Sequence, residues 1–156
     1  MATLSVNIAQ MKVSAAPDTF SAVGLGSCMG VVVYDPVRKI GGMIHVLLPN
    51  SKDMNAADSR TKFADPGIFD LVDAVVKAGG MRKNLVAKMA GGAAMLNAAT
   101  SQVGLRNAEE SKRVLEALNV KILAQDTGGT CGRTVTFDLQ TCTMCVSTLS
   151  KGKVNF

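Results

Sequence analysis

Aromatic side chains are scarce in this sequence, which contains no tryptophan and one tyrosine. Proteins that bind single-stranded nucleic acid stack bases on aromatic side chains, so this scarcity argues against that class. The net charge of +5 does not reverse the argument, because the Lys and Arg residues are scattered rather than gathered into a basic run. Scattered charges of this kind are typical of solvated faces. The functional alternative is a surface that attracts an acidic partner, with nucleic acid the weaker candidate.

Long apolar runs are also absent. No stretch approaches the roughly 20 apolar residues that a helix needs to cross a bilayer. The opening residues, MATLSVNIAQMKV, lack the basic segment, long apolar run and cleavage site of a signal peptide. We therefore expect a soluble, cytoplasmic chain without membrane insertion. Its 156 residues, 47% of them hydrophobic, suffice for one domain, 1–156, with its own core.

Cysteine is limited to four positions, and histidine to one. Cys142 and Cys145 have the spacing of half a zinc site, but only Cys131 and His45 could complete the four ligands that zinc requires. In a strand, residues three apart also point to opposite faces. A core of this size needs no disulfides, and nothing signals secretion. We therefore expect no metal, no other cofactor and ordinary core or edge-strand cysteines at 142 and 145.

The hydrophobic pattern predicts two amphipathic helices. The first begins at Asp65-Pro66, with Asp65 as cap, and ends at Gly79-Gly80; the second begins with Asn107 as cap. Residues 50–62 are polar and predict a long loop. Strands are predicted at 4–8, 20–23, 28–34, 40–48, 86–89, 120–124, 135–137 and 142–149. Several strands precede the first helix, which predicts an α/β fold with one or more mixed β-sheets layered with amphipathic helices.

A glycine-rich segment surrounds Cys28 in the run Val23-Gly-Leu-Gly-Ser-Cys-Met-Gly30. A dinucleotide-binding loop would open a helix, whereas three valines follow here and favour a strand. A second interpretation is a glycine bulge in which Cys28 is a small buried residue. The third makes Cys28 a nucleophile on a tight turn, where the glycines let a substrate carbonyl approach the backbone and free N–H groups form an oxyanion hole.

The single histidine favours the third interpretation. Asp35-Pro-Val-Arg38 has the composition of a β-turn. Because 28 plus 45 equals 36 plus 37, a hairpin centred on this turn places Cys28 directly opposite His45 on the same face. Such cross-strand pairs have Cβ atoms about 4.5–5.5 Å apart. A register slip of two residues would leave them diagonal neighbours, and a slip of one would separate them.

A cysteine beside a histidine can act as a nucleophile with a general base. A free thiol, with a pKa of about 8.5, is only a few per cent thiolate at neutral pH. An adjacent imidazole accepts the thiol proton and can return it to a leaving amine. We therefore expect the pKa of Cys28 to lie below its ordinary value. This chemistry does not separate an amidase from a cysteine peptidase, an esterase or a thiol transferase.

An ordered set of motifs resembles the chemoreceptor glutamine deamidases, the CheD family. It begins with Gly-Leu-Gly-Ser-Cys28, a valine strand, Asp-Pro and Gly-Gly-Met-Ile-His45. It continues with Leu-Leu-Pro49, Lys62-Phe-Ala-Asp65, Ala87-Lys-Met-Ala-Gly-Gly-Ala93, Gly104-Leu-Arg-Asn107, Asp126-Thr-Gly-Gly129 and Gly132-Arg133. The resemblance covers nearly the whole chain.

This resemblance implies hydrolysis of selected glutamines to glutamate on the cytoplasmic helices of methyl-accepting chemotaxis receptors through a cysteine thioester. Hydrolysis of glutamyl methyl esters is a second activity that the resemblance suggests. It also implies a partner, the phosphatase CheC. Matching positions make Cys28 the nucleophile and His45 the base, with Gly26, Lys62 and Phe63 near the substrate. The family can carry a catalytic threonine where this chain has Ala22, which leaves Ser27 as a nearby hydroxyl. The alternative is a weakly catalytic binding module that regulates CheC.

Overall fold

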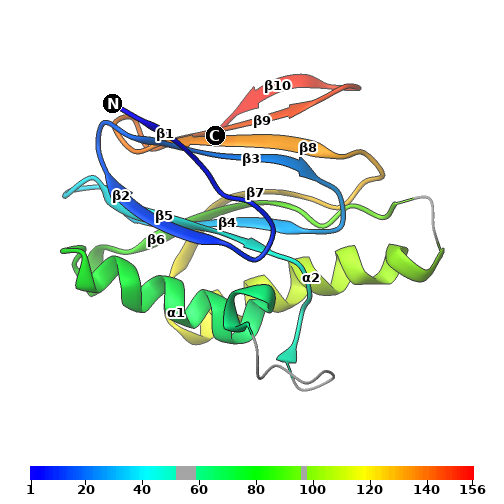
Figure 1. The fold of residues 1–156 in the computed structure, drawn as a ribbon, viewed down its shortest axis with the longest axis horizontal. Helices are drawn as coiled ribbons and strands as arrows, with labels where there is room; N and C mark the ends of the chain where they lie inside the picture. The colour runs from blue at the N-terminus through cyan, green and yellow to red at the C-terminus, as the bar shows by residue number, and fades with distance from the viewer. Residues whose placement is uncertain (52–58, 96–97) are drawn as a thin grey trace.

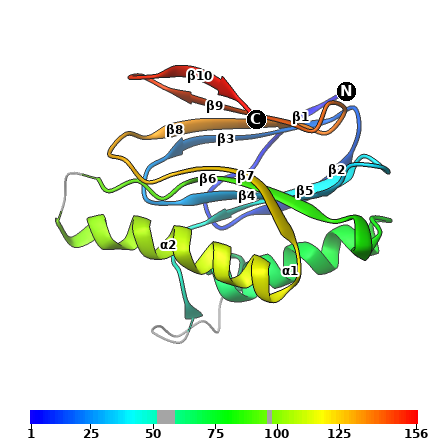
Figure 2. The same cartoon turned by 180° about the vertical axis from the view of Figure 1, so that it is seen from behind.

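Two β-sheets lie face to face, and two helices cover the outer face of one of them (Figures 1 and 2). The computed structural model describes residues 1–51, 59–95 and 98–156, so most of the loop predicted over 50–62 lies outside the described residues. The first sheet has the order β1 (Thr3–Ser5), β3 (Thr19–Leu25), β8 (Arg133–Asp138), β9 (Thr143–Thr148) and β10 (Gly152–Asn155). The second has the order β2 (Met11–Ala15), β5 (Ile40–Val46), β4 (Met29–Asp35), β6 (Val86–Gly91) and β7 (Lys121–Thr127).

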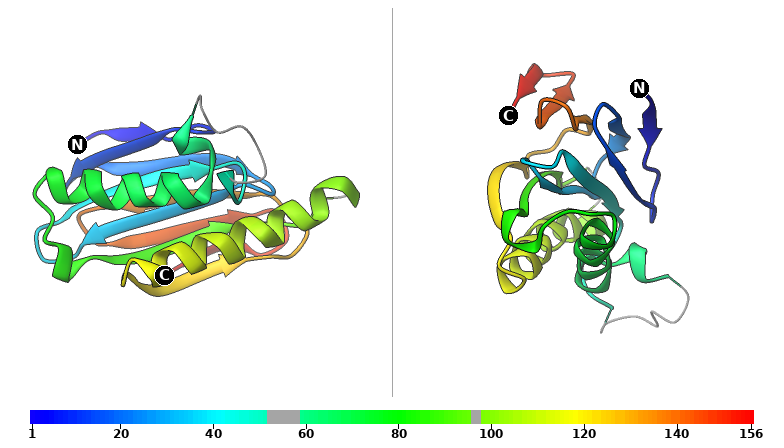
Figure 3. Two further views of the ribbon diagram at one scale, coloured as in Figure 1. Left: turned by 90° about the horizontal axis from the view of Figure 1, so that it is seen from below. Right: turned by 90° about the vertical axis from the view of Figure 1, so that its left-hand side faces the viewer.

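Both sheets are mixed, as the sequence predicts. Strand β1 is parallel to β3 and β6 is parallel to β7, whereas the other neighbouring pairs are antiparallel. Helices α1 (Ala64–Lys77) and α2 (Ala98–Ala117) lie on the same face of the second sheet (Figure 3). Two short 3-10 helices, η2 (Arg60–Lys62) and η3 (Arg82–Asn84), complete the described elements. The predicted α/β class with layered helices is therefore confirmed.

Strand β4 is the centre of the core because all seven of its residues are buried. Val31 and Val33 pack with the helices, while Val32 and Tyr34 pack between the two sheets. This alternation is the ordinary consequence of strand geometry, in which successive side chains point to opposite faces. A strand covered on both sides reads as a continuous apolar run, which is how this segment appears in the sequence.

The helix boundaries correct two predictions. Helix α1 begins at Ala64 with Phe63 as its N-cap residue, and Asp65 lies inside the first turn, where it accepts hydrogen bonds from Ser51. Helix α2 begins at Ala98, so the prediction that Asn107 caps it is wrong. Thr, Ser and Gly in the first half of α2 have weak helix propensity, so the sequence did not predict that the helix begins before Asn107.

Two strands, β2 and β10, were not predicted from the sequence. Strand β2 lies at the edge of the second sheet, with four partly buried residues followed by one exposed residue, and all four residues of β10 are exposed. Strands of this kind are held by ladder hydrogen bonds and bury little apolar surface, so they leave a weak hydrophobic pattern. Among the helices of the described residues, none combines the length and the apolar character that crossing a membrane requires.

Candidate active site

Cys28 lies where the chain crosses from one sheet to the other. Residues Gly26, Ser27 and Cys28 form a bend between β3 of the first sheet and β4 of the second. The bend is tied down by the segment that follows β6, since Gly92 N–H donates to the Cys28 carbonyl at 2.9 Å and Ala93 N–H donates to the Gly26 carbonyl at 2.9 Å. These hydrogen bonds fix the backbone at Cys28. The residue is buried, with 7% of its surface exposed.

The contact with β6 requires a glycine at position 91. Gly91 has a φ of +127°, and a Cβ built there would lie 2.1 Å from the Cys28 carbonyl oxygen. A side chain could therefore not be accommodated without moving the backbone of Cys28. The Gly91-Gly92 pair, one of several such pairs in the sequence, serves close backbone approach.

The register of the β4–β5 hairpin differs from the prediction by two residues. His45 pairs with Gly30, not with Cys28, and Cys28 itself precedes β4. The predicted direct opposition of Cys28 and His45 on paired strands is therefore wrong. The cause is the turn: β4 ends at Asp35 and β5 begins at Ile40, and Lys39 adopts a left-handed φ of 57°, which lengthens the loop.

The two-residue shift keeps both side chains on one side of the second sheet. Cys28 belongs to the apolar cluster between the sheets, together with Met43. His45 is two residues beyond Met43 in β5 and therefore points the same way. Diagonal neighbours across a strand pair are about 7–8 Å apart, a separation that an imidazole can span.

A main-chain carbonyl orients the imidazole. His45 Nδ1 lies 3.1 Å from the carbonyl oxygen of Val6, between β1 and β2. A carbonyl can only accept, so Nδ1 carries the proton of the neutral ring and Nε2 keeps a free lone pair. Nε2 is buried and has no hydrogen-bond partner among the described residues. This is the tautomer that a general base requires.

The Val6 carbonyl contacts His45 in this chain, which has Ala22 where the family can carry a catalytic threonine. Ala22 is 1% exposed and offers no polar side-chain atom. Val6 is held in turn by its own N–H, which donates to the Ser21 carbonyl at 2.8 Å. Sequence reasoning missed this orienting group because a backbone carbonyl leaves no signature in residue identity.

Burial changes the protonation of both candidate groups. Desolvation raises the pKa of the Cys28 thiol above its ordinary value. Desolvation also lowers the pKa of His45, against the smaller opposing effect of the hydrogen bond to Val6. At neutral pH the pair is therefore a thiol and a neutral imidazole, and the expected lowering of the thiol pKa is contradicted.

These shifts predict how Cys28 reacts with iodoacetamide. The thiolate is the reactive form, so a raised pKa lowers the rate at pH 7 and lets the rate keep rising with pH beyond the range of a free thiol. We expect Cys28 to be alkylated roughly an order of magnitude more slowly than the exposed Cys131 at pH 7, because burial also restricts access to the sulfur. Peptide mass spectrometry over a pH series measures both rates; faster modification of Cys28 at pH 7 would contradict the neutral pair.

The remaining candidate residues lie close to the segment that follows His45. The Lys62 carbonyl accepts hydrogen bonds from Leu47 N–H at 3.0 Å and Leu48 N–H at 2.9 Å. Phe63 forms an isolated bridge with Leu48 and is 2% exposed, so a substrate would reach its ring only after the surrounding chain moves. The fold thus brings Lys62 and Phe63 against Leu47 and Leu48, the residues that follow the His45 strand.

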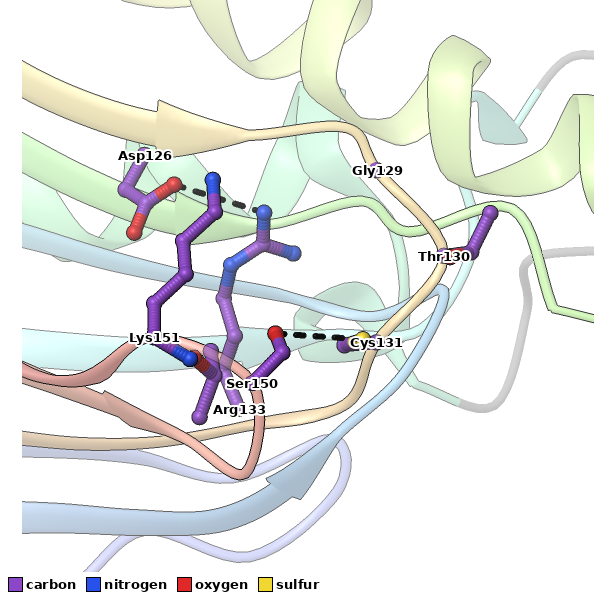
Figure 4. A pocket seen from close by; sticks show the side chains of 8 residues that line it. Asp126, Gly129, Thr130, Cys131, Arg133, Ser150 and Lys151 are labelled. Carbon is purple, nitrogen blue, oxygen red and sulfur yellow. Dashed lines mark hydrogen bonds and ion pairs between the residues drawn. The ribbon is translucent and has the colours of Figure 1, made fainter.

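A cavity of about 340 Å³, whose lining includes the charged residues Asp126, Arg133 and Lys151, lies at the ends of β7 and β8 (Figure 4). Arg133 lines it and donates to the carbonyls of Gly91 at 3.2 Å and Gly128 at 2.8 Å, while its ion pair with Asp126 measures 3.3 Å. Arg133 is 7% exposed. It therefore braces the Gly91 segment that contacts Cys28, and little of its side chain is left to meet a partner.

Comparisons with known proteins give a consistent result. Residues 47–148 match the family described as CheD, chemotactic sensory transduction. The chain is similar to a probable chemoreceptor glutamine deamidase CheD of Desulforamulus reducens, with 42% identity over 88% of this chain and 86% of the relative. A probable chemoreceptor glutamine deamidase CheD of Lachnoclostridium phytofermentans is 41% identical over 95% of this chain and 94% of the relative. The chemoreceptor glutamine deamidase CheD of Bacillus subtilis is 36% identical over 96% of this chain and 93% of the relative.

Proposed function

This chain belongs to the CheD family, and on that basis we propose that it hydrolyses glutamine side chains of chemoreceptors to glutamate, with Cys28 as nucleophile and His45 as base. The observation that carries the assignment is the buried, unpartnered Nε2 of His45 on the same side of the sheet as Cys28. A free lone pair aimed away from the Val6 carbonyl is suited to take the thiol proton.

The reaction proceeds in two halves. In the first, Cys28 Sγ attacks the carboxamide carbon while His45 Nε2 takes the thiol proton, and the tetrahedral intermediate collapses as the imidazolium protonates the leaving amine. Ammonia departs and a thioester remains. In the second half, His45 removes a proton from water, the resulting hydroxide attacks the thioester, and Cys28 leaves with its proton restored. The same sequence with an alcohol as leaving group would hydrolyse a glutamyl methyl ester.

The neutral resting pair suits this order of events. A thiol and an imidazole that are both uncharged bury at low cost, whereas an ion pair in the same place would lose its hydration. Charge then develops only when the carboxamide is in place to receive the sulfur. The burial that raises the thiol pKa also protects the nucleophile from unproductive reactions.

Substrate contacts are assigned to the rim of the bend. Gly26 has no side chain, and the partly exposed Met95 lies against it, with Sδ 3.3 Å from where a Cβ would be. We place the incoming glutamine beside Gly26 and the Met95 side chain that covers it, with the Lys62 ammonium attracting acidic receptor helices and Phe63 supporting the same region. Ser27 remains the candidate third polar group, although the Val6 carbonyl already orients His45.

The proposed partners follow from the substrate. Chemoreceptor helices that carry methylation-site glutamines are cytoplasmic, so we place the protein in the cytoplasm, with the phosphatase CheC as a competing partner. A pure binding module that regulates CheC was suggested by the missing hydroxyl at Ala22. The Val6 carbonyl supplies the orientation that this hydroxyl would have given, so no observation favours that alternative.

The decisive experiment is incubation of the protein with receptor cytoplasmic fragments. We expect mass spectrometry to find glutamines converted to glutamate at selected sites, with the small mass gain of replacing an amide –NH2 by –OH. A fragment whose reactive glutamines are replaced by asparagine is the control and should stay unmodified. Unchanged receptor fragments after prolonged incubation with folded enzyme would refute the proposed function.

A further inference from the structure

One side-chain amide joins the two halves of the candidate active site. Asn107 is completely buried in the middle of α2. Its Nδ2 donates to the Ser27 carbonyl at 2.8 Å and to the Leu47 carbonyl at 3.0 Å. Ser27 immediately precedes the nucleophile, and Leu47 follows the base by two residues. Both N–H groups of the amide are thus used to link the Cys28 bend to the His45 strand.

Glycines bring α2 close enough for this contact. A Cβ at Gly104 would lie 2.2 Å from the Ala93 carbonyl oxygen, and one at Gly92 would lie 2.8 Å from the Gly104 carbonyl oxygen. The helix backbone therefore rests directly on the chain that follows β6. Asn107 lies three residues beyond Gly104 and so faces the same way, toward the bend.

The hydrogen bond to Ser27 also sets the direction of the next N–H. The Ser27–Cys28 peptide is trans, as the one cis bond of the described residues joins Ala16 and Pro17. In a trans peptide the N–H points opposite to the C=O. Because the Ser27 carbonyl points into the core at Asn107, the Cys28 N–H points away from it. That N–H donates to no acceptor among the described residues.

We propose that Asn107 is a positioning residue that turns the Cys28 N–H into an oxyanion donor and fixes the separation of Cys28 from His45. Negative charge develops on the carboxamide oxygen as the sulfur attacks, and a fixed N–H next to that sulfur stabilises it. Asn107 touches neither the substrate nor the sulfur and acts through the backbone alone. This inference rests on the proposed roles of Cys28 and His45.

The unpartnered oxygen of the same amide supports a role beyond packing. Asn107 Oδ1 is buried and accepts no hydrogen bond from the described residues. A buried acceptor without a donor is unfavourable. An apolar side chain would avoid that cost, but it could not supply two donors to Ser27 and Leu47.

The test replaces Asn107 with leucine, which has a similar shape but no donors. We expect kcat for receptor deamidation to fall about 100-fold, the usual effect of losing an oxyanion donor, with KM nearly unchanged. A receptor peptide in which an aldehyde replaces the side-chain carboxamide of the glutamine should bind about 100-fold more weakly, since the oxygen of its hemithioacetal with Cys28 occupies the oxyanion position. Iodoacetamide alkylation of Cys28 needs no oxyanion donor and should stay within about twofold of wild type.

Ser111→Ala is the matched control. Ser111 is one turn further along α2, is completely buried, and its hydroxyl has no partner among the described residues. Its removal should leave deamidation, aldehyde binding and alkylation unchanged. If Asn107→Leu does not fold, Asn107→Gln is used instead, because it keeps the donors but displaces them, and the same pattern with a smaller loss is expected.

Two outcomes would overturn the inference. One is a kcat within twofold of wild type in the folded Asn107 variant, and the other is an equal loss of alkylation and deamidation, which would indicate general disorder of the bend. Both are read against Cys28→Ala. If Cys28→Ala is inactive while Asn107 variants keep full activity, only the positioning role fails; if Cys28→Ala retains activity, the proposed function itself fails.

Discussion

Replacing Cys28 with alanine should lower receptor deamidation by about a millionfold, to the level of buffer alone, because the thioester cannot form without the sulfur. The protein should remain folded. The bend is held by main-chain hydrogen bonds from Gly92 and Ala93, and these do not involve the sulfur. Removing one buried sulfur atom costs about 1 kcal/mol of unfolding free energy, an ordinary core substitution.

The matched control is Cys131→Ala, which removes an exposed thiol and should keep full activity. Rates are measured by mass spectrometry of receptor fragments, and folding by thermal unfolding. Receptor binding by Cys28→Ala should be unimpaired, since the variant lacks only the reacting atom. Substantial deamidation by folded Cys28→Ala would exclude this residue as the nucleophile.

Substituting alanine for Gly91 should cause the largest loss of stability of any single methyl group added near the site. The new Cβ would lie 2.1 Å from the Cys28 carbonyl oxygen, and φ at this residue is +127°, a region that L residues rarely adopt. Backbone strain and steric overlap together should lower the unfolding free energy by about 3–5 kcal/mol. Deamidation should fall as well, because the overlap is relieved by moving the Cys28 backbone.

Gly24→Ala separates the two contributions. Gly24 also has a positive φ, +70°, but nothing lies within 4 Å of the added Cβ. This variant should therefore lose only the backbone term, about 1–2 kcal/mol, and keep its activity. Chemical denaturation of both variants gives the difference. Equal losses in the two proteins would show that the contact between Gly91 and Cys28 is unimportant.

Sequence patterns predicted the parts of the fold that bury apolar surface regularly. The valine run in β4 and the apolar stripe of α1 are continuous or periodic, so these elements were found within a residue or two of their true bounds. The bend at Cys28 was predicted from its glycines, and the structure places it between β3 and β4. These features depend on local residue preferences, which sequence records directly.

Features set by long-range contact were predicted poorly. The predicted hairpin register differs from the observed one by two residues because Lys39 adopts a left-handed conformation, which is not expected from a lysine in the sequence. Asn107 resembled a helix cap, yet it lies inside α2 and bonds to residues 60 and 80 positions away in the chain. The local sequence does not distinguish an asparagine that caps a helix from one that hydrogen-bonds to a distant segment, because the same side-chain amide group makes both kinds of hydrogen bond.

The acceptor that orients His45 belongs to the peptide backbone at Val6, and this determines which genetic changes the site can absorb. Exchanging the Val6 side chain for another apolar one leaves the carbonyl in place, so an alanine scan would not detect the contribution of this carbonyl. Inserting or deleting a residue between β1 and β2 would instead carry a different carbonyl, or none, to the imidazole. The orientation of the His45 ring therefore depends on the length of that connection and not on the identity of any residue within it.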